Sequence, residues 1–358
     1  MTIDARENAV LTRIETFRRR RPVFRDEIVT MAHGAGGKSA ALIDAVFLDA
    51  FTNDDLAPLA DAACLTMPGG ERLAFSTDSF VVRPRFFPRG SIGHLAVHGT
   101  VNDVAMVGAR PFWLSAAFVI EEGFPVAELR DIVSDIAAAR AAHVTIVSGD
   151  TKVVERGSAD GLYITTAGLG ALAEGRVLSP GLVQPGDVVL VLGTIADHGM
   201  AVMLARGDLA LDADIRSDTA PLGALVEVLF RAAPSTRWMR DPTRGGLGTV
   251  CNELAMATNL AVVLDESALP IDPAVNAACD LLGIDPLYVA NEGKLVAIVA
   301  PDEADAALAA LRADPLGSRA AAIGHIRSDP AGIVVLLTTF GGTRIVDMLV
   351  GDPLPRIC

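Results

Sequence analysis

Apolar residues recur along this chain with two periods, one typical of helices and one typical of strands. Helical spacing predicts helices at residues 40–51, 91–108, 126–143, 222–232, 247–258 and 304–311. Short apolar runs predict strands at residues 73–82, 112–120, 144–147, 162–169, 188–192, 260–264 and 332–338. The interleaving of the two element types favours an α/β protein.

A turn-rich stretch at residues 175–187 is the best candidate for a domain boundary, because glycine and proline gather there. The 358 residues suffice for two domains of ordinary size. We therefore expect four parts: an arginine-rich extension (1–30) with a short helix at 9–21, a first domain (31–174), a second domain (175–340) and a tail (341–358).

The composition argues against a membrane protein, a secreted protein and a nucleic-acid-binding protein. No apolar run approaches the ~20 residues of a membrane helix, and no secretory core follows Met1. We therefore expect a cytoplasmic protein without a membrane partner. A net charge of −14 disfavours nucleic acid as a partner and is compatible with local sites for Mg²⁺ and phosphate.

Histidine and cysteine give no metal-binding signature. His94 and His98 have helical i,i+4 spacing, but position 95 is leucine where a zinc protease has glutamate, which favours surface or packing roles. The four cysteines form no C-x-x-C pair. Three of them we expect in the core: Cys64, Cys251 and Cys279.

A glycine-rich segment precedes the first predicted helix. His33, Gly34, Gly36, Gly37 and Lys38 belong to it. A glycine loop that opens a helix suits an anion, because free N–H groups and the helix dipole point at it. It is not a Walker A loop, since alanine stands where that pattern requires its first glycine. Alone, the loop is equally compatible with a plain turn.

Three aspartates stand where ligand residues are commonly found. Asp78 lies inside a predicted strand, where aspartate is unfavourable. Asn102 and Asp103 interrupt an apolar helix, and Asp150 lies in a predicted loop, 148–154, after a short strand. Separately each has an ordinary structural explanation. Together with the glycine loop they indicate an ATP·Mg²⁺ site, because Mg²⁺ takes a few carboxylates and substrate phosphates.

Two segments of the second half carry further polar residues. Asp241 and Pro242 resemble an N-cap and first-turn proline for the helix at 247–258, and Arg244 with its neighbouring glycines suits a phosphate. Glu292 lies in a turn between apolar runs, where a charged side chain is usually just solvated.

The chain ends on a cysteine behind a proline-stiffened arm. Pro353, Pro355 and Arg356 precede Cys358. Most termini fray and carry no chemistry unless something holds them. A terminal thiol can nevertheless reach into a site built elsewhere and present a nucleophile there. An ordinary tail that happens to end in cysteine is the alternative.

Seven short motifs, taken together, carry a resemblance to a known family. In order they are His33-Gly-Ala-Gly-Gly, Ser76-Thr-Asp-Ser, Thr100-Val-Asn-Asp-Val-Ala-Met, Gly149-Asp-Thr-Lys-Val-Val, Arg240-Asp-Pro-Thr-Arg-Gly-Gly-Leu, Asn291-Glu-Gly and Pro355-Arg-Ile-Cys. From about residue 31 to its end the chain closely resembles the HypE family of hydrogenase maturation proteins. That family belongs to the aminoimidazole-ribonucleotide-synthetase-like (PurM-like) superfamily, and the Pro-Arg-Ile-Cys ending is the most specific motif.

The resemblance implies a two-domain α/β (α+β) PurM-like fold that dimerises through the sheet of its first domain and binds ATP and Mg²⁺ there. It also implies a reaction. The carbamoyltransferase HypF places a carbamoyl group on the terminal cysteine, and ATP-dependent dehydration converts this thiocarboxamide into a thiocyanate. The cyano group then passes to iron on a HypC–HypD scaffold and becomes a cyanide ligand of the [NiFe] hydrogenase.

Roles for single residues follow from the resemblance and the chemistry together. We expect Mg²⁺ ligands at Asp78, Asp103 and Asp150. Nucleotide contacts are expected from the Gly34, Gly36 and Gly37 backbone, Lys38, Asn102 and Arg244. Cys358 would carry the substrate, and Lys152 would neutralise charge on the reacting group. Glu292 is the first candidate for the base that deprotonates nitrogen, and His33 the second.

Other functions remain possible at this point. A purine-biosynthetic synthetase or a thiamine-phosphate kinase of the same superfamily leaves Cys358 without a use. A selenophosphate synthetase carries cysteine or selenocysteine near the glycine loop, where this chain has His33. An ATP-gated scaffold that docks maturation partners is the alternative outside the enzymes.

Overall fold

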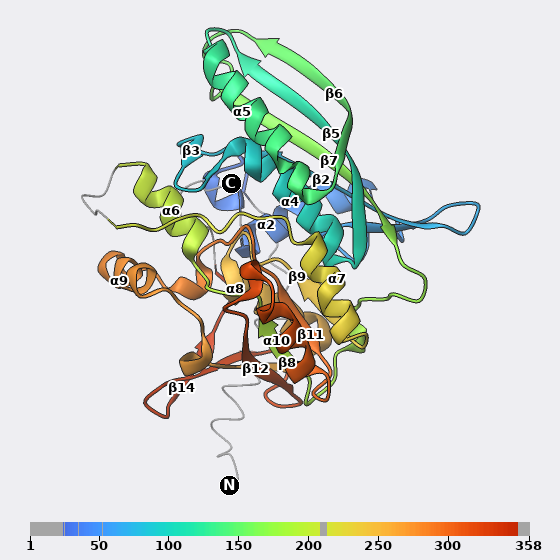
Figure 1. Ribbon diagram of the computed structural model, residues 1–358. Coiled ribbons are helices and arrows are strands. Elements are labelled where there is room, and N and C mark those ends of the chain that lie inside the picture. The colour runs from blue at the N-terminus through green and yellow to red at the C-terminus, as the bar shows by residue number, and fades with distance from the viewer. Residues whose placement is uncertain (1–23, 25, 35, 52, 208–212, 350–358) are drawn as a thin grey trace.

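The computed structural model of the protein describes residues 24, 26–34, 36–51, 53–207 and 213–349. The predicted helix at 9–21 and the terminal Cys358 lie outside the described residues. Two sheets organise the rest of the chain, one in each half, with helices packed on them (Figure 1). Within the part of the chain that the structure describes, every helix is too short or too polar to span a membrane.

The first sheet has five strands in the order β1-β2-β7-β5-β6. Their bounds are β1 (Ala63–Thr66), β2 (Arg72–Phe80), β5 (Ala109–Glu121), β6 (Thr145–Val154) and β7 (Leu162–Leu172). The pairs β1–β2, β2–β7 and β5–β7 are antiparallel, and β5–β6 is parallel. A two-stranded hairpin, β3 (Phe86–Phe87) and β4 (Gly90–Ser91), leads into the first long helix.

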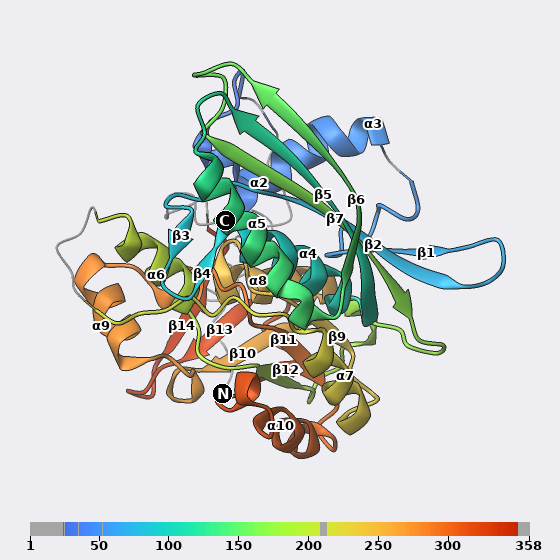
Figure 2. The same cartoon turned by 45° about the horizontal axis from the view of Figure 1, so that its top comes forward.

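Two helices cover one face of this sheet (Figure 2), α4 (Ile92–Met106) and α5 (Val126–Ala138), which continues as a 3-10 turn at Ala139–Ala142. Ser91 caps α4, because its Oγ accepts hydrogen bonds from the N–H groups of Gly93 and His94. Leu95 of α4 and Ile132 of α5 are fully buried with Ile164 of β7. The predicted helices at 91–108 and 126–143 are therefore confirmed.

The strand β6 is longer than the sequence pattern predicts. Residues 148–154, expected as a loop, continue the strand because β5 offers a parallel partner along its whole length, with Ala117 opposite Asp150. All but the last residue of β6 are exposed. Alternate residues of a strand point to opposite faces, so β6 is an edge strand that is exposed on both of its faces.

The second sheet has seven strands in the order β14-β13-β10-β12-β8-β11-β9. Their bounds are β8 (Val188–Val191), β9 (Trp238–Arg240), β10 (Ala261–Asp265), β11 (Val296–Val299), β12 (Ala321–Arg327), β13 (Val334–Leu337) and β14 (Thr343–Val346). The helices of this half are α6 (Asp197–Ala205), α7 (Gly223–Ala232), α8 (Gly246–Thr258), α9 (Pro273–Leu282) and α10 (Ala304–Arg312).

Both faces of the second sheet are buried. Val189 and Val191 pack with α8 on one face, while Leu190 packs with α7 and α10 on the other. Burial on two faces explains why these strands read as continuous apolar runs instead of alternating ones.

Two expectations need correction, one about the last strand and one about a cysteine. The strand at 332–338 is not the last one, because β14 pairs with β13 inside the segment assigned to the tail. Cys251 and Cys279 are buried as predicted, but Cys64 is exposed, because it lies in β1 at the edge of the first sheet. The short strands β1, β3, β4, β9, β11, β12 and β14 and the helix α9 were not predicted.

The first described segments precede the first sheet. A 3-10 turn (Met31–Gly34) leads to α2 (Gly36–Leu42), a π-helical turn (Ile43–Leu48) and α3 (Asp49–Phe51). The predicted helix at 40–51 is thus confirmed and begins earlier, at Gly36.

Candidate active site

A cavity of about 1050 Å³ lies where the first sheet, α4 and α8 come together. Its lining includes the α2 region, the segment before β1, the end of β2, α4, β9 with the residues that follow it, α8 and the loop before β11. Of the residues that sequence reasoning selected, it brings together Gly34, Asp78, Asp103, Arg244 and Glu292.

Five of the carboxyl groups that line this cavity form what we call the acid wall: Asp61, Asp78, Asp103, Asp241 and Glu292. Burial raises the pKa of every one of them, that of Asp61 to about 6. Repulsion among the carboxylates raises the pKa of Asp103, Asp241 and Glu292 further, to well above the ordinary value. Carboxyl groups clustered in this way favour the binding of a divalent cation or of protons.

Two arginines supply the positive charge of the cavity. Arg240 lies 2.9 Å from Asp61 and 3.6 Å from Glu253, both of which line the cavity. The Arg244 guanidinium lies 3.8 Å from Asp78 and is half exposed. Its position at the mouth suits a phosphate that enters from solvent.

The carboxylates of β2 and α4 are held by neighbouring donors. The Ser76 hydroxyl donates to Asp103 at 2.7 Å, and the Ser79 N–H donates to Asp78 at 2.7 Å. Within the described ranges, no three histidine, cysteine or acidic side chains form a ready-made metal cage. The donors nevertheless fit Mg²⁺, because this ion takes one or two carboxylates and completes its shell with water and phosphate oxygens.

Glu292 is buried, unlike the solvated turn residue that the sequence suggests. Its peptide group is fixed at both ends: the N–H donates to Asp218 at 3.0 Å, and the carbonyl accepts from Asn102 at 3.1 Å. Its side chain is 3% exposed and faces the cavity lining. A carboxyl group with a raised pKa inside a reaction cavity is suited to general acid–base work.

Asn102 has a different task from the nucleotide contact expected of it. Its amide donates to the carbonyls of Ala220 and Glu292 and accepts from the Leu222 N–H, so these loops use its hydrogen-bonding capacity. The side chain is fully buried and does not line the cavity. It therefore orders the loop that carries Glu292.

The glycine loop contributes to the cavity only in part. Gly34 lines it, while Gly36 and Gly37 open α2. His33 is buried away from the cavity, with Nε2 2.9 Å from Asp26 and its ring against Phe24. Lys38 is also held by Asp26, at 3.1 Å. The structure thus gives His33 and Lys38 a structural partner, and neither lines the cavity.

Asp150 and Lys152 are not brought to the acid wall of their own chain. Two strands separate β6 from β2, which puts Asp150 roughly 14 Å from Asp78 at ordinary strand spacing. The pairing rows also place Asp150 beside Ala117, Thr165 and Ser79, on the opposite face of the sheet from Asp78. Within one chain these aspartates cannot share a metal ion.

The predicted cap at Asp241 is wrong. The helix α8 begins at Gly246, with the left-handed Gly245 (φ 73°) as its N-cap residue. A side chain at Gly246 would meet the Val289 carbonyl at 2.6 Å, so two glycines are required here. Asp241 follows β9 instead and belongs to the acid wall.

Sequence reasoning missed three cavity residues: Asp61, Arg240 and Glu253. Arg240 and Asp241 belong to a motif that the family resemblance had already singled out. Asp61 carries no local signal, because it precedes β1 in an irregular segment; it lines the cavity and pairs with Arg240.

The chain is similar to known proteins along most of its length. The family described as AIR synthase related protein matches in two parts, its N-terminal domain at residues 59–172 and its C-terminal domain at residues 184–336. Carbamoyl dehydratase HypE of Cupriavidus necator is 52% identical, over 92% of this chain and 95% of its own length. That of Rhodobacter capsulatus is 54% identical, over 94% of this chain and 99% of its own length.

The chain belongs to the HypE family. It is therefore an enzyme of the carbamoyl dehydratase type that serves hydrogenase maturation, and the predicted PurM-like fold is confirmed.

Solved structures agree with this assignment. The structure of HypE in complex with ATP is 45% identical, with a TM-score of 0.77 over 92% of this chain and all of its own. The structure of a HypE–HypF complex is 46% identical, with a TM-score of 0.82 over 86% of this chain and all of its own.

Proposed function

We propose that this chain uses ATP to dehydrate an S-carbamoyl group on Cys358 to a thiocyanate, the source of the cyanide ligands of a [NiFe] hydrogenase. The observation that carries the proposal is the acid wall: a buried Glu292 with a raised pKa shares one cavity with carboxylates suited to Mg²⁺. A relative solved with ATP supports the nucleotide.

The chemistry needs an activated oxygen and a base. The amide oxygen attacks the γ-phosphorus of ATP, and ADP leaves. The nitrogen then gives up its two protons while the C–O bond breaks, so that C≡N forms and phosphate departs with the former amide oxygen. Positioning and charge neutralisation dominate phosphoryl transfer. Glu292 accepts a proton from nitrogen, a role that its place in the cavity and its high pKa suit.

Mg²⁺ would be held by Asp78 and Asp103, with Asp241 beside them. When bound, it supplies positive charge to the phosphates of the nucleotide. Arg244 extends toward Gly34 and Asp78, and it would contact phosphate at the mouth of the cavity.

Asp150 and Lys152 enter the reaction from a second copy of the chain. The open face of the first sheet carries them, and the strand pairing places two large exposed side chains on that same face, Phe75 of β2 and Trp113 of β5. A homodimer formed through this sheet would cover that surface and bring one copy's Lys152 to the other copy's acid wall.

The partners follow from the same reaction. HypF would load Cys358 with the carbamoyl group, in line with a relative solved as a HypE–HypF complex. The HypC–HypD scaffold would accept the cyano group. In this scheme residues 31–174 bind the nucleotide, residues 175–340 supply Glu292, residues 341–358 carry the substrate, and the extension 1–30 has no assigned role.

Intact mass spectrometry tests the proposal. Chain loaded by HypF and then freed of nucleotide should carry about 43 Da on its C-terminal peptide, falling to about 25 Da once ATP·Mg²⁺ is added. Cys358→Ala is the control and should show neither mass. A persistent 43 Da adduct with intact ATP would contradict the dehydratase and favour an ATP-gated scaffold. An unloaded Cys358 beside active HypF would favour a small-molecule synthetase.

A further inference from the structure

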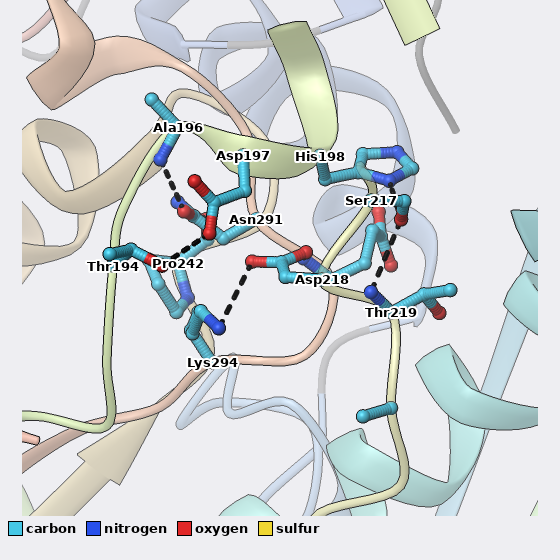
Figure 3. Close-up of polar contacts among 12 residues, drawn as sticks. Thr194, Ala196, Asp197, His198, Ser217, Asp218, Thr219, Pro242, Asn291 and Lys294 are labelled. Atoms are coloured by element: carbon cyan, nitrogen blue, oxygen red, sulfur yellow. Dashed lines mark hydrogen bonds and ion pairs between the residues drawn. The ribbon is translucent and has the colours of Figure 1, made fainter. Parts of the chain in front are cut away.

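A buried polar segment, Ser217–Ala220, lies beside the loop that holds Asn291 and Lys294 (Figure 3), and Glu292 belongs to the same loop. Ser217 and Asp218 are 1% and 9% exposed, although the segment belongs to no helix or strand. The first half of the chain holds it at two points. The Ser217 N–H donates to the Pro88 carbonyl, and Asn102 donates to the Ala220 carbonyl.

Two histidines fix the side chains of this segment. His198 Nδ1 lies 2.8 Å from the Ser217 hydroxyl, which also accepts from the Thr219 N–H. His98 Nδ1 lies 3.0 Å from the Thr219 hydroxyl. With contacts on each side of it, Asp218 has little freedom to move.

Asp218 contacts the Glu292 loop directly. Its Oδ1 accepts the Glu292 N–H at 3.0 Å, and a side chain at Gly293 would meet the Asp218 carbonyl at 1.9 Å. Only glycine allows this approach. Asp218 and Asn102 therefore hold the two ends of the Glu292 peptide group, and the loop presses against the segment at the next residue.

The other oxygen of Asp218 is buried without a hydrogen-bond partner among the described residues. The cation facing it is Lys294, whose Nζ is 3.8 Å away and whose side chain is 11% exposed. Lys294 also interacts electrostatically with Asp197, whose carboxylate accepts a hydrogen bond from the Thr194 hydroxyl (Figure 3). A buried carboxylate without a partner is unfavourable, so Lys294 supplies the charge that keeps Asp218 in place.

We propose that Asp218, with Lys294 as its counter-charge, is a positioning residue that aims the Glu292 carboxyl into the cavity. Asp218 and Lys294 do not line the cavity, so they act through the loop and not on the substrate. This inference rests on the proposed role of Glu292 in the reaction.

Kinetics on Cys358-loaded enzyme provide the test. Asp218→Asn and Lys294→Met should each lower kcat for dehydration about 10- to 100-fold, the effect of a misplaced catalytic group. The KM for ATP should stay within about twofold, because both variants leave the nucleotide contacts intact.

A matched control separates positioning from general stability. Asp187 is 2% exposed, accepts the Gln184 N–H at 2.7 Å and lies 3.6 Å from Arg237, so its surroundings resemble those of Asp218. It does not line the cavity. Asp187→Asn should lower the melting temperature to a similar degree and leave kcat unchanged. An equal loss of kcat in this control would reduce Asp218 to a structural residue.

A double variant decides whether Asp218 acts through Glu292. If it does, Glu292→Gln/Asp218→Asn should be no slower than Glu292→Gln alone, because the positioned group is already gone. Additive losses would overturn the inference. Full turnover by Glu292→Gln would instead overturn the proposed role of Glu292, so the two failures are distinguishable.

Discussion

The acid wall and the outer strand β6 both carry charged motif residues, yet the fold treats them in opposite ways. Five distant segments converge to bury the wall, whereas Asp150 and Lys152 lie exposed on the open face of an edge strand. Burial raises the pKa values of the wall carboxyl groups, whereas all but the last residue of β6 are exposed. The acid wall is thus assembled within a single chain, whereas Asp150 and Lys152 lie on the other face of the sheet from Asp78.

The most severe change on the wall side is Glu292→Gln. It removes the proton acceptor at the same side-chain volume, and we expect the rate of dehydration to fall about 10²- to 10⁴-fold. HypF should still load Cys358, because loading does not use this group. The mass of the C-terminal peptide over time measures both steps, and a variant that dehydrates at the normal rate would remove Glu292 from the mechanism.

A mixing experiment addresses the strand side. Lys152→Ala homodimers should lose about 100-fold in rate, and so should Glu292→Gln homodimers. Co-refolding the two variants in equal amounts should restore about a quarter of the wild-type rate, because half of the dimers regain one intact site.

The control for mixing is a chain that carries both changes, combined with wild type in the same way. In a mixed dimer each site then combines one wild-type and one changed residue, so no mixed dimer has an intact site and the rate should follow the wild-type dimers alone. If Lys152→Ala and Glu292→Gln fail to complement each other, Lys152 acts within its own chain and the comparison between wall and strand is wrong.

The wall's affinity for the metal–nucleotide complex gives a smaller effect. At about hundredfold excess over Kd, Mg²⁺·ATP should stabilise the wild type by about 2.7 kcal/mol. Asp103→Asn keeps an acceptor for the Ser76 hydroxyl but loses a charge, so its melting temperature should rise less with the complex. Without Mg²⁺·ATP it should be at least as stable as the wild type, because a buried repulsion is relieved. Asp280→Asn, on the surface of α9, is the control.

Burial near the wall also predicts a pH effect. Burial, with a smaller contribution from His94, lowers the pKa of His98 to about 3. Below pH 6.5 this histidine is protonated in the unfolded chain but stays neutral in the folded chain. The free energy of unfolding therefore falls as the pH falls. Between pH 7 and 5 the loss is about 2 kcal/mol. His98→Asn should remove it, as urea unfolding at the two values of pH would show; an unchanged slope would contradict this.

Much of the fold followed from local patterns. Periodicity located α4, α5 and α7 because each buries one side or all of its surface within a single contiguous stretch. It failed for β6, whose length depends on pairing with β5, and for β14, which exists because β13 provides an edge. Pairing between distant strands leaves little trace in the sequence of either one.

Sequence motifs likewise identified some residues of the candidate site and could not define the roles of others. Asp78, Asp103, Arg244 and Glu292 were selected from motifs, and the structure brings them into one cavity. Sequence could not separate residues that line the cavity from residues that hold it, since Asn102 and His33 lie in the same motifs. That distinction depends on which groups each side chain bonds to, and Asn102 bonds to three backbone groups of neighbouring loops.

The fate of the amide oxygen tests the central claim most directly. Carbamoyl-loaded enzyme with a heavy oxygen isotope in the carbamoyl group would be isolated, its label measured by mass, and ATP·Mg²⁺ added. Because the oxygen leaves as part of phosphate, the released phosphate should contain one labelled oxygen for each labelled carbamoyl group that is dehydrated. Thiocyanate that forms while the phosphate stays unlabelled and the label enters water would contradict ATP-dependent activation of the amide.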